Sequence, residues 1–274
     1  MYKIIFIDID GTLRKNDKTI SKITVEAINK VTKKGILVVL CSGRPQKYTE
    51  NISKKCNASR YVITSSGANI YDYEENKIMY LNSMNKEACV ELYEVAKSNN
   101  VRFSMNVGER IVTTRLKYFD GSEIELSEDI TTFVEKNDVL QCNIADKDFD
   151  KMKNVIPFIE RVKNCEIKNR HKSLLNSNEA KLGDIYCDVS DFNTCKGNAV
   201  KKLCELLNID EKNAIAIGDD YNDISMFKVV GYSVAMENSS DEVKSYADHV
   251  TKSNEEDGVA IFLEKLIDTE KEVL

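Results

Sequence analysis

Several features that mark other classes of protein are missing from this sequence. It has only two prolines in 274 residues, no Cys-x-x-Cys pair among its eight cysteines, and no long run of lysines and arginines. A charged residue interrupts every hydrophobic run within about ten positions, well short of the ~18–20 apolar residues that a membrane span requires. We therefore expect reduced, buried thiols in place of a disulfide or zinc framework, and neither a stiff linker nor a transmembrane helix.

The net charge of the chain argues against two classes of binding partner, nucleic acids and anionic membranes. The formal net charge is −6 at pH 7, whereas binding to nucleic acid or an anionic membrane needs clustered positive charge. The N-terminal run from Met1 to Asp8 is too short for a signal peptide and ends in a carboxylate. We expect a soluble cytoplasmic protein that binds neither nucleic acid nor a membrane, and the sequence carries no signal for its oligomeric state.

Both ends of the chain alternate continuous apolar runs with helical patterns. Strands are predicted at 2–9, 36–41, 61–64, 213–217 and 232–236, and helices at 21–34, from 45, and at 194–208, 222–228 and 258–267. Ser21 is the predicted N-cap of the first helix, Gly35 its C-cap, and Pro45 the first residue of the second helix. Buried strands separated by helices predict an α/β fold with a doubly wound parallel sheet.

The middle of the chain has a different pattern. Two alternating segments at 69–73 and 77–81 predict a β-hairpin, and the strands and helices that follow predict an α+β unit with a small sheet of its own. The predicted organisation is a discontinuous core, residues 1–82 and 188–274, interrupted by an inserted domain at 83–187.

Carboxylates crowd the ends of two predicted strands. Asp8 and Asp10 close the first strand, and because side chains alternate along a strand they begin on the same side of the edge where parallel sheets bind ligands. Asp219, Asp220 and Asp223 follow a second apolar strand. A capped turn would explain any one of these residues. Together they predict a divalent cation, and Mg²⁺ is the cation typically held by a few carboxylates and a substrate phosphate.

Two further segments have features that favour the binding of an anion. Ser42 and Gly43 lie where a strand meets the next helix, so that backbone N–H groups and the helix dipole can bind a phosphate. Arg44 and Lys196 are placed at the starts of helices, where a cation opposes the dipole unless an anion is bound. An ordinary strand-to-helix turn and an exposed lysine are the alternatives.

In order along the chain, these segments resemble the four motifs of the haloacid dehalogenase (HAD) superfamily: Asp8-Ile9-Asp10-Gly11-Thr12, Ser42-Gly43-Arg44, Lys196-Gly197 and Gly218-Asp219-Asp220-Tyr221-Asn222-Asp223. The insertion resembles the type IIB cap of the Cof-like sugar-phosphate phosphatases. The segment 66–70 resembles the Asn-Gly-Ala sequence that precedes this cap, with Ser66 in place of the asparagine. The resemblance implies a Rossmann-like HAD core with an inserted α+β cap.

The resemblance also implies a Mg²⁺-dependent phosphatase that acts on a small phosphorylated metabolite. Asp8 would be the nucleophile that forms an aspartyl-phosphate, and Asp10 the general acid and base. The implied metal site comprises the Asp8 carboxylate, the Asp10 backbone carbonyl and Asp219. Asp223 would hold a metal-bound water or Lys196, and Asp220 is an accessory residue.

The implied phosphate-binding residues are Thr12, Ser42, Gly43, Lys196 and Asn222. Four cationic residues just before the return to the core are candidates for contacting the leaving group: Arg170, His171, Lys172 and Lys181. A sugar phosphate is the first expectation for the substrate, and phosphorylated cofactors remain open. A phosphotransferase or phosphomutase of the same superfamily, and a non-catalytic ligand-binding protein on the same scaffold, are the alternative functions.

Overall fold

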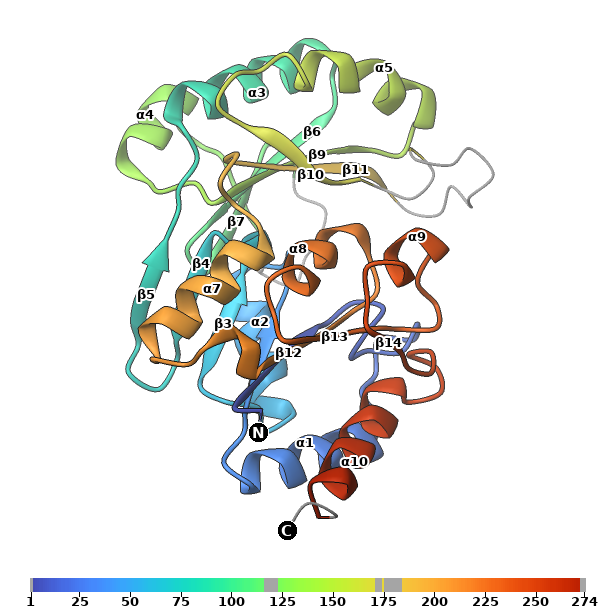
Figure 1. Cartoon of the computed structure of the whole chain (residues 1–274). Coiled ribbons are helices and arrows are strands. Elements are labelled where there is room, and N and C mark those ends of the chain that lie inside the picture. The colour runs from blue at the N-terminus through green and yellow to red at the C-terminus, as the bar shows by residue number, and fades with distance from the viewer. Residues whose placement is uncertain (1, 116–122, 171–173, 175–183, 272–274) are drawn as a thin grey trace. The chain divides into compact units, whose positions relative to one another are not determined.

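The structure, a computed structural model, describes residues 2–115, 123–170, 174 and 184–271. The chain divides into two compact units (Figure 1). The first, which we call the core, comprises residues 1–80 and 195–274, and the second, the inserted unit, comprises residues 81–194. These boundaries differ from the predicted 83 and 187, chiefly because the last strand of the inserted unit, β11 (Ile185–Ser190), continues past residue 187.

The core is built on an eight-stranded sheet of order β14-β13-β12-β1-β2-β3-β4-β5. Strands β14 to β3 in this order are parallel, and β4 runs antiparallel to β3. The strands are β1 (Ile4–Asp8), β2 (Leu37–Cys41), β3 (Tyr61–Thr64), β4 (Asn69–Asp72), β5 (Lys77–Leu81), β12 (Ala214–Gly218), β13 (Tyr232–Ala235) and β14 (His249–Val250). The predicted doubly wound parallel sheet is confirmed.

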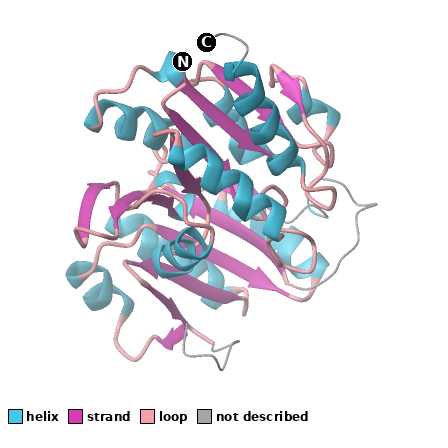
Figure 2. Cartoon of the chain, turned by 90° about the horizontal axis from the view of Figure 1, so that it is seen from below, coloured by secondary structure: helices cyan, strands magenta, loops and turns pink. Residues whose placement is uncertain are grey.

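Helices cover both faces of this sheet (Figures 1 and 2). Ile5 and Ile7 of β1 pack in one apolar layer with α1 (Lys22–Lys33), α2 (Gln46–Lys55) and α10 (Gly258–Lys271). Ile4 and Phe6 pack in the opposite layer with α7 (Lys196–Leu206), α8 (Ile224–Phe227) and α9 (Asp241–Lys244). The uninterrupted apolar sequence of β1 follows from burial on both faces.

The predicted helix ends hold at Ser21 and differ by one residue at Gly35 and Pro45: the C-cap of α1 is Lys34, and Gly35 is the left-handed residue after it. The Ser21 hydroxyl accepts a hydrogen bond from the backbone N–H of Thr24 at 3.1 Å, and Gly35 follows α1 with φ +83°. Pro45 is the N-cap of α2 and not its first helical residue, since its ψ of 162° is extended. Short 3₁₀ turns lie at Ser65–Gly67 (η1), Glu211–Asn213 (η2) and Tyr221–Asp223 (η3).

The inserted unit contains a six-stranded sheet of order β10-β11-β9-β6-β7-β8. Besides β11, its strands are β6 (Arg102–Val107), β7 (Arg110–Thr113), β8 (Glu123–Glu125), β9 (Gln141–Asp146) and β10 (Glu166–Arg170). The helices α3 (Lys86–Ser98), α4 (Ile130–Lys136) and α5 (Phe149–Ile159) pack on one face, where Phe103 and Ile144 are buried. The other face carries polar side chains, and Asn143 donates to Asp188 across it at 2.8 Å.

Two further findings bear on the class of protein. All eight cysteines are free, and only Cys195 among them is partly exposed. In the described part of the chain, no helix combines the length and apolar character needed to cross a bilayer.

Candidate active site

Three neighbouring parallel strands bring the predicted site residues to one edge of the core sheet. Asp8 is the last residue of β1, Ser42 follows β2, and Asp219 follows β12. Asp8 has the same parity along β1 as Ile4 and Phe6, so its side chain starts on the face that α7 and α8 cover. The carboxyl edge of a parallel sheet is where such folds bind ligands.

Lys196 connects two of the carboxylates. Its ammonium lies 2.5 Å from Asp8 Oδ1 and 2.6 Å from Asp223 Oδ1, and its side chain is only 1 % exposed. Lys196 is the first residue of α7, where the helix dipole disfavours a cation. The two carboxylates, 188 and 27 residues away in sequence, explain how this lysine is accommodated.

Asp223 also orders the turn that follows β12. Its Oδ2 accepts hydrogen bonds from the backbone N–H groups of Asp219 at 2.9 Å and Asp220 at 3.0 Å. Asp220 caps the short η3 turn, and its carboxylate accepts from the N–H of Tyr221. Asp220 therefore has a structural place in this turn, whereas Asp219 and Asp223 point carboxylate oxygens toward Asp8.

The loop after β1 is held closely against Asp219. Thr12 Oγ1 donates to Asp219 Oδ1 at 2.8 Å. Gly11 has φ +94°, and a Cβ at this position would fall 2.3 Å from Asp219 Oδ2, so no other residue fits. Asn238, which sequence reasoning missed, donates from its side chain to the Gly11 carbonyl at 2.9 Å. It lies outside the motifs, and its sequence neighbourhood gives no signal of this contact.

The electrostatics of the cluster are those of crowded, buried charges. Burial raises the pKa of Asp8 well above its usual value, the neighbouring Asp223 and Asp219 raise it further, and Lys196 acts in the opposite direction. Burial alone would lower the pKa of Lys196, but Asp223 and Asp8 outweigh it and raise that pKa, so the lysine stays protonated. Burial likewise raises the pKa of the Cys41 thiol, which excludes a reactive thiolate there.

The donor set fits a hard divalent cation. Asp8, Asp219 and Asp223 each offer a carboxylate oxygen, these atoms lie within 4.8 Å of one another, and all three residues are buried. The Lys196 ammonium contacts two of these three carboxylates, so the crowding of acidic groups in a region with little water favours a further cation. Oxygen ligands of this kind are the ones that Mg²⁺ prefers.

Asp10 does not join this cluster. Strand β1 ends at Asp8 and the chain turns, so the strand alternation that placed both carboxylates on one side no longer applies. The Asp10 carboxylate instead accepts a hydrogen bond from Arg44 Nε at 2.9 Å, and Arg14 Nη1 lies 3.6 Å away. Arg44, noted in the sequence as an unfavourable cation at a helix start, thus has a carboxylate partner. Sequence reasoning missed Arg14 altogether.

The turn after β2 has the expected form. Ser42 is buried, its hydroxyl accepts from the backbone N–H of Arg44 at 3.1 Å, and it can still donate its own hydrogen. The resembling segment around Ser66 lies beside it, because the Ser66 N–H donates to the Ser42 carbonyl. Ser66 Oγ would lie 3.3 Å from a Cβ at residue 43, a tight contact that places the Ser66 side chain next to Gly43. Asn222 is partly buried in η3.

The predicted leaving-group contacts are mostly outside the described residues. This holds for His171, Lys172 and Lys181. Arg170, at the end of β10, pairs with Glu160 at 2.8 Å. It is therefore partnered within the inserted unit.

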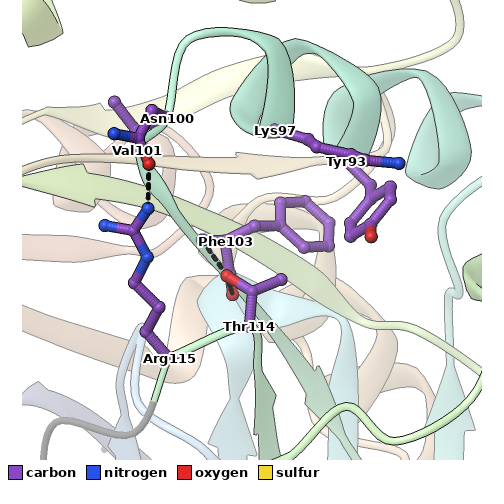
Figure 3. A pocket seen from close by; sticks show the side chains of 7 residues that line it. All are labelled: Tyr93, Lys97, Asn100, Val101, Phe103, Thr114 and Arg115. Carbon is purple, nitrogen blue, oxygen red and sulfur yellow. Dashed lines mark hydrogen bonds between the residues drawn. The ribbon is translucent and has the colours of Figure 1, made fainter.

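The inserted unit also has a cavity of about 180 Å³, which Figure 3 shows. Tyr93 and Phe103 line it with Lys97 at one end and Arg115 at the other. Lys97 lies 5.5 Å from the centre of the Tyr93 ring, and Arg115 donates to the side chain of Asn100. None of the predicted site residues lines this cavity, and we assign it no role.

Known proteins resemble the chain along almost its whole length. The family model of haloacid dehalogenase-like hydrolases matches residues 5–263. The 5-amino-6-(5-phospho-D-ribitylamino)uracil phosphatase YwtE of Bacillus subtilis (strain 168) is 27 % identical, over 97 % of this chain and 98 % of that protein.

Solved structures agree. A haloacid dehalogenase-like hydrolase from Bacteroides thetaiotaomicron is 28 % identical with a TM-score of 0.81, over 97 % of this chain and 100 % of that one. The HAD subclass IIB sugar phosphatase BT4131, at 22 % identity, shares the fold with a TM-score of 0.77, over 96 % of this chain and 98 % of that one. The chain belongs to the haloacid dehalogenase-like hydrolases and is a phosphomonoesterase of the HAD type.

Proposed function

We propose that this protein hydrolyses a small phosphorylated metabolite with Mg²⁺, through an aspartyl-phosphate at Asp8. The observation that carries the proposal is the buried carboxylate of Asp8, 2.5 Å from the Lys196 ammonium and close to Asp219 and Asp223. A carboxylate held in this way is fixed in direction by the ammonium and shielded from bulk water, as a nucleophile toward phosphorus must be.

In the first step, an oxygen of Asp8 attacks phosphorus and the ester P–O bond breaks. The departing oxygen keeps the bonding electron pair and takes a proton from the Asp10 carboxyl. In the second step, a water oxygen attacks phosphorus and gives its proton to Asp10, the bond to Asp8 breaks, and inorganic phosphate leaves. A positioned acid and base of this kind increases the reaction rate by about 10²–10⁴-fold.

The remaining residues bind the transferring phosphoryl group. Ser42 offers a hydroxyl hydrogen, Gly43 a backbone N–H, and Lys196 a buried positive charge. Thr12 and Asn222 complete the predicted set, with Thr12 also fixing Asp219. Mg²⁺ at Asp8, the Asp10 carbonyl and Asp219 would neutralise charge, so that an anionic nucleophile can approach an anionic substrate.

For the substrate, we propose a phosphate ester on a sugar or a sugar-alcohol chain. Two considerations support this class. The resemblance to Cof-like phosphatases implies sugar phosphates, and the relative YwtE is named for a phosphorylated ribityl compound. Release of inorganic phosphate, measured over some tens of phosphorylated metabolites, tests the proposal. Transfer of the phosphoryl group to a second hydroxyl without phosphate release would favour the phosphomutase alternative.

Removing the metal should abolish the phosphatase activity. We expect EDTA to lower phosphate release from p-nitrophenyl phosphate to less than a tenth, Mg²⁺ to restore it, and Ca²⁺ to restore it poorly, because its longer bonds and variable coordination misplace the nucleophile. Mg²⁺ should also stabilise the folded protein in the absence of substrate. At a Mg²⁺ concentration of 100 times its Kd, the free energy of unfolding should rise by about 2.7 kcal/mol, which is measured as a higher Tm. Asp219→Asn should weaken both effects. Full activity in metal-free buffer would exclude this mechanism.

The inserted unit should influence selectivity more than chemistry. If Arg170 contacts the leaving group, Arg170→Ala should lower kcat/KM for the preferred metabolite by about tenfold, the worth of one hydrogen bond to a charged group. The value for p-nitrophenyl phosphate should stay within about twofold, because only binding energy from the non-reacting portion is lost. Arg161→Ala is the matched control, since Arg161 is exposed and lies over the Phe158 ring of the same unit. Equal effects on both substrates would remove Arg170 from this role.

A further inference from the structure

The carboxylate of Asp10 pairs with two arginines, and the guanidinium groups of both arginines lie over the ring of one tyrosine. Arg44 Nε donates to Asp10 Oδ2 at 2.9 Å, and Arg14 Nη1 lies 3.6 Å from Asp10 Oδ1. The guanidinium carbons of Arg44 and Arg14 lie 5.4 and 5.7 Å from the centre of the Tyr48 ring. We call Asp10, Arg14, Arg44 and Tyr48 the Asp10 clamp.

Arg14 is the fixed part of this clamp. Its Nε and Nη2 donate to the Lys18 carbonyl at 2.8 and 2.6 Å, and its Nη1 donates to the Tyr48 hydroxyl. Only 12 % of the Arg14 side chain is exposed. Tyr48 is therefore anchored through its hydroxyl, and its ring offers Arg44 a rigid surface next to Asp10.

The clamp makes the two oxygens of Asp10 different. Oδ2 is occupied by Arg44, whereas the distance from Oδ1 to Arg14 exceeds that of a hydrogen bond. The Asp10 side chain is 38 % exposed, so its carboxylate is accessible to solvent. A carboxylate with one oxygen fixed by a hydrogen bond and the other in a longer ion pair, without a hydrogen bond, has the geometry that proton transfer at a defined place requires.

Folding stability does not account for this arrangement. The Arg44 side chain is 52 % exposed, and ion pairs between exposed side chains contribute little to stability. In addition, Arg44 lies directly before Pro45, the N-cap of α2, where the helix dipole disfavours a cation.

We propose that Arg44 is a positioning residue for Asp10, itself held in place by Tyr48 and Arg14. The inference rests on the proposed role of Asp10 as general acid and extends it to residues outside the phosphate-binding set. It predicts that loss of Arg44 harms most the reactions in which the departing oxygen needs a proton.

The experiment compares two aryl phosphates. p-Nitrophenolate leaves readily without a proton, whereas phenolate is a stronger base and benefits from acid assistance. Because kcat/KM reports the steps up to transfer of the phosphoryl group to Asp8, it isolates the departure of the leaving group. Arg44→Ala should lower kcat/KM for phenyl phosphate about tenfold more than for p-nitrophenyl phosphate, a part of what a positioned acid contributes. Tyr48→Leu should act in the same direction to a smaller extent.

Chemical rescue and a matched control complete the test. Guanidinium ion at low, non-denaturing concentration should partly restore phenyl phosphate hydrolysis by Arg44→Ala, and NaCl at equal ionic strength should not. Arg60→Ala is the control, because Arg60 also pairs with a carboxylate, Asp72 at 2.6 Å, and lies 5.2 Å from a tyrosine ring, that of Tyr61. It should change neither rate by more than about twofold, a difference well under 1 kcal/mol.

The outcomes separate the inference from the function on which it rests. If Asp10→Asn shows the dependence on the leaving group and Arg44→Ala does not, the positioning role is wrong and the acid role stands. Equal losses on both substrates would make Arg44 a phosphate ligand instead. If Asp10→Asn itself shows no such dependence, the acid role of Asp10 fails and the positioning role with it.

Discussion

Asp8→Asn is expected to lower kcat by at least about 10⁴-fold while the protein remains folded. The change removes the attacking oxygen and its charge but keeps the shape of the side chain, so Lys196 retains Asp223 as a partner at 2.6 Å. Phosphate release and a thermal melt on the same preparation measure the two effects. Freshly purified protein, checked by mass, excludes deamidation back to aspartate.

A direct measurement accompanies this variant. Acid quenching of the wild-type enzyme with labelled substrate should trap a phosphorylated protein, and the Asp8→Asn variant should give none. Asp210→Asn is the control, since Asp210 is exposed and caps the short η2 turn of the same core. Turnover of Asp8→Asn within tenfold of the wild type would show that another group attacks phosphorus.

Lys196→Met should cost both activity and stability. The ammonium is buried between Asp8 and Asp223, and removing it leaves two carboxylates without their cation in a region of low polarity. Breaking a buried ion pair in this way costs about 3–5 kcal/mol of unfolding free energy. Activity should fall by at least about 10²-fold, the scale on which loss of one preorganised charge acts. Chemical denaturation and steady-state kinetics measure the two losses.

A second variant separates folding from catalysis. In Lys196→Met/Asp223→Asn one of the unpaired charges is gone, and the asparagine oxygen can still accept from the N–H groups of Asp219 and Asp220. We expect the double variant to recover much of the stability and none of the activity. Recovery of activity along with stability would mean that Lys196 serves the fold alone.

The sequence predicts the centre of the site because two simple rules operate there. Apolar runs such as β1 and β12 are buried strands, and the carboxyl ends of adjacent parallel strands meet. These rules are enough to place Asp8 near Asp219. The pairing of Lys196 with both Asp8 and Asp223 was only partly foreseeable, since an unfavourable cation at a helix start signals a partner without naming it.

The parts that the sequence did not predict depend on where regular structure stops. Asp10 was expected beside Asp8, but the strand ends at Asp8 and the turn directs Asp10 toward Arg44. Alternation is informative only inside a strand. Strand β14 and helix α9 are too short to show a periodic pattern, so they were missed. The contact of Asn238 with Gly11 joins residues 227 apart, a relation that local pattern does not contain.

The position of β1 in the middle of the core sheet has a consequence for synthesis on the ribosome. One neighbour of β1 is β2, but the other is β12, which begins only at Ala214. The inserted unit is continuous in sequence, so it can fold as soon as its last residues emerge. During that time one edge of the apolar strand β1 has no partner, and such an edge can pair with other chains. The nascent chain should therefore depend most on chaperones while the inserted unit is being made, and least once β12 has paired with β1.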